Sequence, residues 1–496
     1  MPKGERSMTG NDSRPPLEPL RPSYRIQYFS DEELKKLQQA TLNILENVGV
    51  KFATDKALDI LSSHGADVDK TTGIVKMKPD LVFKAMKTAP RFFTLAARVP
   101  EYDLHLQENT TYFTTDGCGV EVVDLGASEP RPSTKADVGM MARIADYLPS
   151  IGFYWPMVSA QDCGRASPLH ELEAGWNNTV KHFQSETIMG EAEAKYAVEM
   201  ALVIAGSREN LRKRPPLSSL ICTVSPLMQD KPGMEAAMIF AEAGIPVFFL
   251  SMPTLGTTAP ATHAGALAMA DAENISATVL LQLMFPGCPV GHSIMQAWAD
   301  MRTGGYVSYP RDARGRYGVV DMAHHWGLPS LGACYGTDSK VAGTWQQAAE
   351  TALDPFLAGL ASPEIVTGMG LSRTYTRLFP EQIILDDDLY QRARAYLQKM
   401  EVDDHSLALE AIKNVGPGGH FLGQKHTREH MRTSLVRGVT HALESGSKYR
   451  DPIEVAREKA RWILDNHQPE PLEPAQQAEF DKILSAAEKE LALLYA

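Results

Sequence analysis

The sequence of 496 residues lacks the marks of a secreted, membrane-spanning or nucleic-acid-binding protein. Its five cysteines are odd in number, widely spaced and never arranged as C-x-x-C, which argues against a disulfide framework or a zinc ribbon and favours a reducing cytoplasm. The N-terminal segment contains no apolar core of a secretory signal, and no apolar run is long enough to span a bilayer. The net charge of −12 disfavours nucleic acid and anionic membranes as partners, because both need a basic surface.

Motifs for metal chemistry are also scarce. No H-x-H follows the first expected barrel strand, as it would in many metal hydrolases. The run from His426 to His430 matches the H-x-x-E-H pattern of some zinc proteases, in which one helix face presents two ligands. No third ligand is evident in the sequence, so we interpret this run as a charged helix start.

From residue 112 onward, short apolar strands alternate with helices. The pattern is clearest at 245–263, where the buried run 247–250 leads into a turn rich in Pro, Gly and Thr and then into a helix of small residues over 264–285. About eight such units over a span near the ~250 residues of a (β/α)8 TIM-type barrel predict that fold. A doubly wound sheet is the alternative, disfavoured because no strand ends in a G-x-G-x-x-G turn. The expected strands are 112–115, 152–158, 182–186, 217–224, 246–250, 290–295, 330–335 and 365–369.

The flanking segments predict a division into four parts. Residues 1–28 are polar and rich in proline, which is typical of a flexible tail. Residues 29–110 are expected to form an N-terminal helical cap with short strands, beginning at a capping box from Ser30 to Glu33. The barrel is expected over 111–380 and a C-terminal helical extension over 381–496. A glycine-rich loop over 416–423 interrupts that extension and carries His420.

The expected strand ends carry polar and aromatic side chains. In a barrel these ends share one face, where ligands bind. One strand aromatic is more often core than ligand cage, but many aromatics beside acidic residues suit a cationic ligand, because aromatic faces bind quaternary ammonium groups. The polar positions are Asp116, Gln161, Asp162, Ser185, Glu186, Ser225, Thr254, His292, Gln296 and 336–340, and the aromatics are Tyr154, Trp155, Phe248, Phe249, Trp298, Tyr306, Tyr309, Tyr335 and Trp345.

Five separate segments resemble the trimethylamine–corrinoid methyltransferase family, in the order in which that family has them. They are SDEEL at 30–34, LENVGV at 45–50, LGTTAPAT at 255–262, GTDSK at 336–340 and GPGGHFLG at 416–423. The match extends from about residue 29 to the C-terminus. The founding member of the family uses pyrrolysine to activate trimethylamine, and this sequence contains none. It therefore resembles the non-pyrrolysine branch, which includes glycine betaine methyltransferases and relatives acting on proline betaine or carnitine.

The resemblance implies a (β/α)8 barrel that passes a methyl group from a methylated amine to Co(I) of a separate corrinoid protein. A betaine nitrogen is already quaternary and leaves as a neutral tertiary amine, so the protein has to hold the cation and align nitrogen, methyl and cobalt. We therefore expect no catalytic side chain and no metal ligand. We also expect no cofactor bound by this chain, because the D-x-H-x-x-G pattern of corrinoid (cobalamin) carriers is absent.

The expected partners are the cognate corrinoid protein and a small methylated amine, with glycine betaine as the first candidate. Further copies of the chain are expected as well, in a cytoplasmic homo-oligomer without nucleic acid or membrane. Trp155 and Tyr335, with Phe249, are the expected walls of a cage for the ammonium group. Glu186 and Asp338 are expected to face its charge.

Four further side chains complete the expected substrate site. Lys340 or Arg311 is expected to bind the carboxylate of a betaine, because a cation can pair with it and donate hydrogen bonds. His292 and His420 are expected to close the site. Two other functions remain open at this point. Acidic strand ends suit a metal-dependent barrel lyase or hydrolase, and an aromatic pocket alone suits a betaine sensor without turnover.

Overall fold

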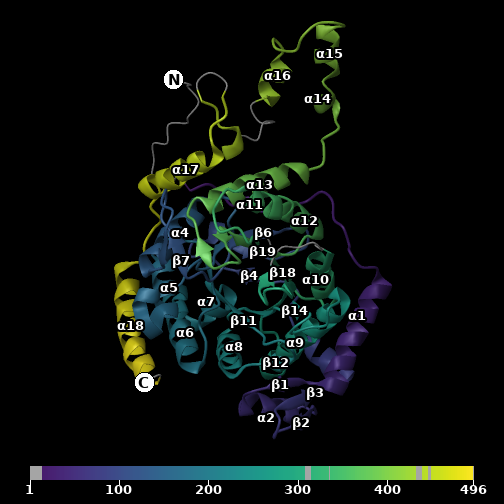
Figure 1. Cartoon of the computed structure of the whole chain (residues 1–496), viewed down its shortest axis with the longest axis vertical. Helices are drawn as coiled ribbons and strands as arrows, with labels where there is room; N and C mark the ends of the chain where they lie inside the picture. The colour runs from purple at the N-terminus through teal and green to yellow at the C-terminus, as the bar shows by residue number, and fades with distance from the viewer. Residues whose placement is uncertain (1–13, 308–313, 334–335, 432–437, 445–447, 495–496) are drawn as a thin grey trace.

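Short apolar strands and the helices that separate them form the centre of the molecule (Figure 1). A computed structural model describes residues 14–307, 314–333, 336–431, 438–444 and 448–494. The N-terminal helices lie at one end of this centre, at the lower right of Figure 1, and the last helix runs along its left side. No helix in these described ranges is both long and apolar enough to cross a bilayer.

The central strands all pair in parallel. One sheet has the order β15-β13-β11-β10-β9 and a second has the order β18-β19-β6. Parallel bridges join the two sheets at both borders, Phe113 with Ile151 and His292 with Ser330. The pairing follows the order of the chain and returns to its start, so each of these strands has a parallel neighbour on both sides. The strands are β6 (Tyr112–Thr115), β9 (Phe153–Tyr154), β10 (His182–Ser185), β11 (Leu217–Cys222), β13 (Val247–Ser251), β15 (Val290–Ile294), β18 (Leu331–Ala333) and β19 (Ile365–Met369).

All of the expected central strands are present, and β6 and β19 have the expected bounds. Helices separate successive strands and pack against them. Two helices rather than one follow β18, because Pro355 has no backbone N–H and fits the first turn of a new helix. The helices are α4 (Lys135–Tyr147), α5 (Ser167–Trp176), α6 (Glu191–Ala205), α7 (Arg208–Lys213), α8 (Lys231–Ala243), α9 (His263–Met284), α10 (Arg314–His325), α11 (Trp345–Thr351), α12 (Asp354–Ala361) and α13 (Gln382–Tyr396).

Side chains of the central strands alternate between two apolar clusters. Phe183 and Phe249 belong to the larger cluster, which the strands share with the surrounding helices. Leu220 and Phe248 belong to a smaller cluster on the opposite face of the strands. The hairpin of β4 (Thr94–Leu95) and β5 (Leu104–His105) closes the amino-terminal end of this smaller cluster, since Leu95 and Leu104 belong to it.

The N-terminal cap contains a small sheet as well as helices. Helices α1 (Asp31–Asn43), α2 (Asp55–Ser63) and α3 (Pro79–Met86) pack on α9, and the capping box at Ser30 is present. Between them, β1 (Val50–Phe52), β2 (Asp67–Asp69) and β3 (Ile74–Lys76) form a sheet with β12 (Met228–Gln229). Its strands are two or three residues long, too short for a period-two pattern to stand out in the sequence.

The C-terminal part is mostly helical, as expected. Helix α17 (Pro452–Asn466) packs on α4 and α13, and α18 (Pro474–Leu494) packs on α6. Three short helices, α14 (Asp404–Leu407), α15 (Leu409–Val415) and α16 (Lys425–His430), project from the centre at the top of Figure 1. Residues 439–441 form a 3-10 turn before α17.

Candidate active site

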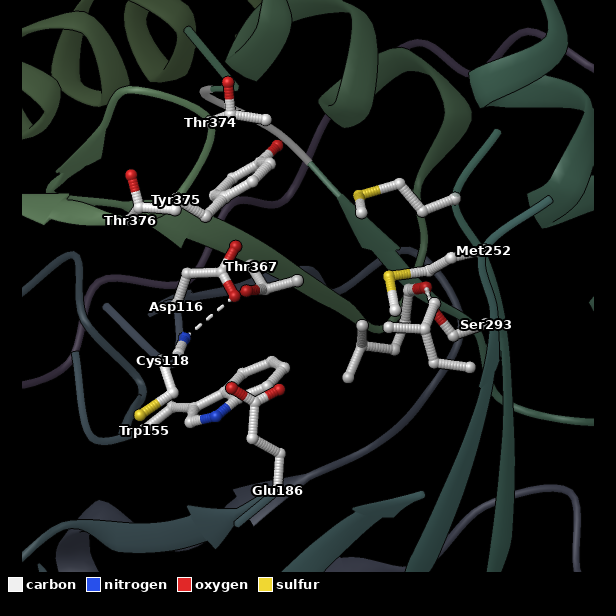
Figure 2. A pocket seen from close by; sticks show the side chains of 14 residues that line it. Asp116, Cys118, Trp155, Glu186, Met252, Ser293, Thr367, Thr374, Tyr375 and Thr376 are labelled. Carbon is white, nitrogen blue, oxygen red and sulfur yellow. Dashed lines mark hydrogen bonds between the residues drawn. The ribbon is translucent and has the colours of Figure 1, made fainter. Parts of the chain in front are cut away.

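A cavity of about 380 Å³ lies at the carboxyl ends of the central strands (Figure 2). This volume falls within the range of about 300–1,000 Å³ that small-molecule sites occupy. Its walls come from the ends of β6, β9, β10, β13 and β15 and from the loop after β20 (Leu371–Ser372). The lining residues are Asp116, Gly117, Cys118, Trp155, Glu186, Leu250, Met252, Ser293, Met295, Leu331, Thr367, Thr374, Tyr375 and Thr376.

Trp155 forms one wall and is held rigidly. It follows β9 directly, and the hydroxyl of Thr115 on β6 accepts a hydrogen bond from its backbone N–H and donates one to its backbone C=O, both at 2.8 Å. The side chain is only 2% exposed. Its indole Nε1 is buried and has no acceptor among the described residues. The indole therefore offers the cavity an aromatic wall and an unused N–H donor.

Two carboxyl groups lie beside this indole. Asp116 follows β6 and accepts a hydrogen bond from the backbone N–H of Gly117 at 2.9 Å, drawn as a dashed line in Figure 2. Glu186 follows β10. A Cβ placed on Gly117 would lie 2.7 Å from Glu186 Oε1 and 2.2 Å from Trp155 Nε1, so both groups pack against this glycine. Only a residue without a side chain fits there.

Burial disfavours the ionised form of both carboxyl groups. Burial raises the pKa of Asp116 to about 7. Burial also raises the pKa of Glu186 well above its usual range, and the negative charges of Asp116 and Glu171 add to this effect. Among the lining residues that the structure describes, no Lys, Arg or His balances the two acids. The cavity therefore suits a ligand with a permanent positive charge, which would balance the acids.

The opposite wall and the roof have a different character. Met252 and Met295 follow β13 and β15 and line the cavity, and Figure 2 shows Met252 across the cavity from the carboxyl groups. The roof is the loop at 373–376, where Thr374 and Tyr375 have φ values of 54° and 62°, a left-handed conformation that side chains rarely adopt. Thr374 donates a hydrogen bond to Asp338 at 2.9 Å, which fixes the roof to the segment after β18.

The chain matches a known family along almost its whole length. A family model described as trimethylamine methyltransferase (MTTB) matches residues 4–492. This chain belongs to the trimethylamine methyltransferase family. The methyltransferase is 33% identical to the trimethylamine methyltransferase MttB of Desulfitobacterium hafniense (strain DSM 10664 / DCB-2), over 93% of this chain and 94% of that protein. It is 30% identical to MttB of Methanosarcina barkeri, over 94% and 96% of the two chains.

A relative that is named for a different substrate is also similar. The glycine betaine methyltransferase of Desulfitobacterium hafniense (strain Y51) is 29% identical to this methyltransferase, over 95% of this chain and 99% of that protein. The family resemblance inferred from the five sequence segments is thereby confirmed.

Of the side chains expected to bind substrate, Trp155 and Glu186 line the cavity of this methyltransferase. Asp338 is not among the lining residues, but it accepts a hydrogen bond from Thr374, which is. Tyr335 and Arg311 lie outside the described residues.

Phe249 and His292 do not line the cavity, contrary to expectation. Phe249 is fully buried in the cluster shared with the helices. His292 Nε2 lies 2.8 Å from Asp271 Oδ1 on α9, so its ring also points to the helices. Because side chains alternate along a strand, the neighbouring residues face the cavity instead. Leu250 and Ser293 line it.

Lys340 and His420 are also placed elsewhere. Both are exposed, and neither is among the lining residues. Lys340 follows the segment that supports the roof, and His420 lies in the loop between α15 and α16, in the part that projects in Figure 1. Hydroxyl groups of Ser293, Thr367 and Thr374 are the lining donors that the sequence interpretation missed. Asp116 was also left out of the expected substrate site, although its position directly after an expected strand marked it as a strand-end polar residue.

The histidines of the H-x-x-E-H run lie together on α16. The rings of His426 and His430 have centroids 4.2 Å apart, and His405 Nε2 lies 3.3 Å from His430 Nε2. Within the described residues, no group of three potential ligands has an arrangement that could hold a metal ion. The structure therefore provides no observation in favour of the metal-dependent lyase or hydrolase.

Proposed function

We propose that residues 111–380 form a (β/α)8 barrel that transfers a methyl group from a quaternary amine to Co(I) of a separate corrinoid protein. The parallel pairing that returns from β19 to β6 supports the barrel. Membership of the methyltransferase family supports the reaction. Residues 29–110 and 381–496 are the N-terminal cap and the C-terminal extension of this barrel.

The charge of the cavity is the observation that carries this proposal. Asp116 and Glu186 face a space that has no cationic side chain in its described lining. Trp155 adds an aromatic wall, and an aromatic face can stabilise a desolvated ammonium group by up to about 2 kcal/mol. A quaternary ammonium group brings a permanent charge and needs no hydrogen-bond acceptor, which suits these walls.

Glycine betaine is the first substrate to test, because a glycine betaine methyltransferase is among the relatives. The hydroxyls of Ser293, Thr367 and Thr374 line the cavity, but they could donate to its carboxylate only by giving up their hydrogen bonds to Leu331 C=O, Thr115 C=O and Asp338. Lys340, the expected partner of that carboxylate, is not in the lining. Proline betaine, carnitine, choline and tetramethylammonium belong in the same panel. All of them carry a quaternary nitrogen with at least two methyl groups, and they differ in the other substituents.

The corrinoid is the methyl acceptor and is carried by the partner protein. The segments that follow β15 and β18 offer exposed apolar side chains for docking, since Trp298 on β16 (Ala297–Ala299), Met301 and Trp345 at the start of α11 are 37%, 79% and 86% exposed. A homo-oligomer in the cytoplasm remains part of the proposal.

The test is methyl transfer to free cob(I)alamin, followed by the absorbance change as methylcobalamin forms. We expect at least one quaternary amine of the panel to give turnover, while trimethylamine gives none. Methylation by no quaternary amine would refute the proposed reaction. Tight binding without turnover would favour the betaine sensor instead.

A further inference from the structure

Asp116 and Glu186 form a pair of acids that cannot both ionise in the empty cavity. Asp116 follows β6 and Glu186 follows β10, the strands on either side of β9, and Glu186 Oε1 packs against Gly117, the residue next to Asp116. Two carboxylates held close together in a buried site repel each other, so one of them keeps a proton. No cation in the described lining relieves this repulsion.

None of the surrounding titratable groups favours ionisation of both acids. Glu171 on α5 and Cys118 after β6 lie near the pair, as does Cys222 at the end of β11, and none of them brings a positive charge. Burial raises the pKa of both thiols, so they stay neutral. Glu171 already accepts hydrogen bonds from Ser159, Ser167 and Thr187. The negative charge of Glu171 therefore increases the tendency of the pair to hold a proton, and the neutral thiols do not oppose it.

The proton belongs on Glu186 rather than on Asp116. The carboxylate of Asp116 is stabilised by the backbone N–H of Gly117 and by the hydroxyl of Thr367. No group in the described ranges of the chain donates a hydrogen bond to Glu186. Its carboxyl group lines the cavity beside Trp155, where the ammonium group of the proposed substrate would lie.

We propose that Glu186 is the proton donor of the reaction and protonates the amine nitrogen once the methyl group has left, because only then is the electron pair of the broken C–N bond free. The proposal rests on the proposed function. The C–N bond breaks with its electron pair remaining on nitrogen, and Co(I) supplies the two electrons of the new Co–C bond and becomes Co(III). The nitrogen takes the proton from the Glu186 O–H, which leaves a carboxylate beside an ammonium ion. Glu186 regains a proton from water after the product departs.

This step makes the transfer directional. An alkylamine has a pKa of about 10, so it takes a proton readily from a carboxyl group. Once protonated, its nitrogen has no free electron pair and cannot take the methyl group back from cobalt. A sulfonium donor behaves differently, because the thioether that leaves is too weakly basic to be protonated. Methyl transfer from a sulfonium should therefore not need Glu186 as an acid.

This difference defines the experiment. Initial rates of cob(I)alamin methylation are measured with glycine betaine and with its sulfur analogue dimethylsulfonioacetate, for the unmodified protein, Glu186→Gln and the control Glu199→Gln on the exposed side of α6. We expect Glu186→Gln to lower kcat with glycine betaine roughly tenfold to a hundredfold, at or below the lower end of the effect of general acids, because the unprotonated amine can take the methyl group back. With the sulfonium we expect a change below about threefold. Equal losses with both donors, or no loss with either, would overturn the assignment.

The pH profile is a second readout, which a purely structural role would not move. A carboxyl group with a raised pKa is protonated below that pKa and loses its proton above it. The kcat of the unmodified protein with glycine betaine should therefore fall as the pH rises past the pKa of the pair, whereas Glu186→Gln should lack this fall and Glu186→Asp should retain it. An alkaline fall that persists in Glu186→Gln would overturn the proposal. Absence of turnover in the unmodified protein would count against the proposed reaction itself.

Discussion

At the scale of single residues, the site depends on the missing side chain of Gly117. Trp155 and Glu186 both occupy space that a Cβ at this position would need, at 2.2 and 2.7 Å. In Gly117→Ala we expect both side chains to be displaced towards the cavity. Methyl transfer to cob(I)alamin should fall at least about tenfold, and the free energy of unfolding should fall by about 1–3 kcal/mol, as for other overpacked sites.

The matched control is Gly423→Ala. A Cβ at Gly423 meets nothing within 4 Å, so we expect neither the methyl transfer rate nor the denaturation midpoint to change. Unchanged activity in Gly117→Ala, with the protein folded, would show that the positions of Trp155 and Glu186 do not matter to the reaction.

At the scale of elements, the sequence predicted the strands better than it predicted which way their side chains point. Apolar runs between turn residues mark strands such as β13, and polar residues directly after a run mark its end, which is how Glu186 was found. Both faces of β13 are buried, so Phe248 and Phe249 look alike in the sequence although they belong to two different apolar clusters on opposite faces of the strand. The roof loop was missed because its left-handed backbone at Thr374 is formed without a glycine, the residue that usually indicates such a conformation in a sequence.

His292 illustrates an element contact that resembles a site residue in the sequence. Asp271 on α9 lies 2.8 Å from the His292 ring on β15 and accepts a hydrogen bond from Thr41 on α1, so one carboxylate joins three elements. We expect His292→Leu to lower the free energy of unfolding by about 1–3 kcal/mol, because a buried carboxylate loses a partner. The KM for the methyl donor should change less than about threefold, since the side chain does not line the cavity.

Denaturant unfolding and cob(I)alamin kinetics measure these two effects. Ser293→Ala is the informative comparison, because Ser293 is the next residue and lines the cavity. A tenfold higher KM in a His292→Leu protein of normal stability would instead return His292 to the substrate site.

At the scale of the whole molecule, Asp146 on α4 connects segments from both ends of the described chain. It accepts hydrogen bonds from the guanidinium of Arg14, near the start, and pairs with His467 after α17 at 2.7 Å. Burial alone would raise the pKa of Asp146, but the hydrogen bond with His467 and the charges of Arg14 and Lys181 lower it to about 2. The carboxylate is therefore a structural anchor rather than a catalytic group.

This anchor should make stability depend on pH in a defined window. A carboxyl group whose pKa is lowered by folding stabilises the protein above its unfolded pKa of about 3.9 and loses that effect as the pH falls towards 2. Asp146→Asn should lower the free energy of unfolding by about 3–5 kcal/mol at pH 7, because the buried Arg14 loses its buried carboxylate and keeps the ion pair with the more exposed Glu470. Asp465→Asn on the exposed side of α17 should change nothing. In denaturant titrations at pH 7, 5 and 3, the gap between Asp146→Asn and the unmodified protein should stay constant down to pH 5 and narrow below it. If this difference in free energy of unfolding does not narrow in acid, the ionised carboxylate of Asp146 is not what holds Arg14 and His467 against α4.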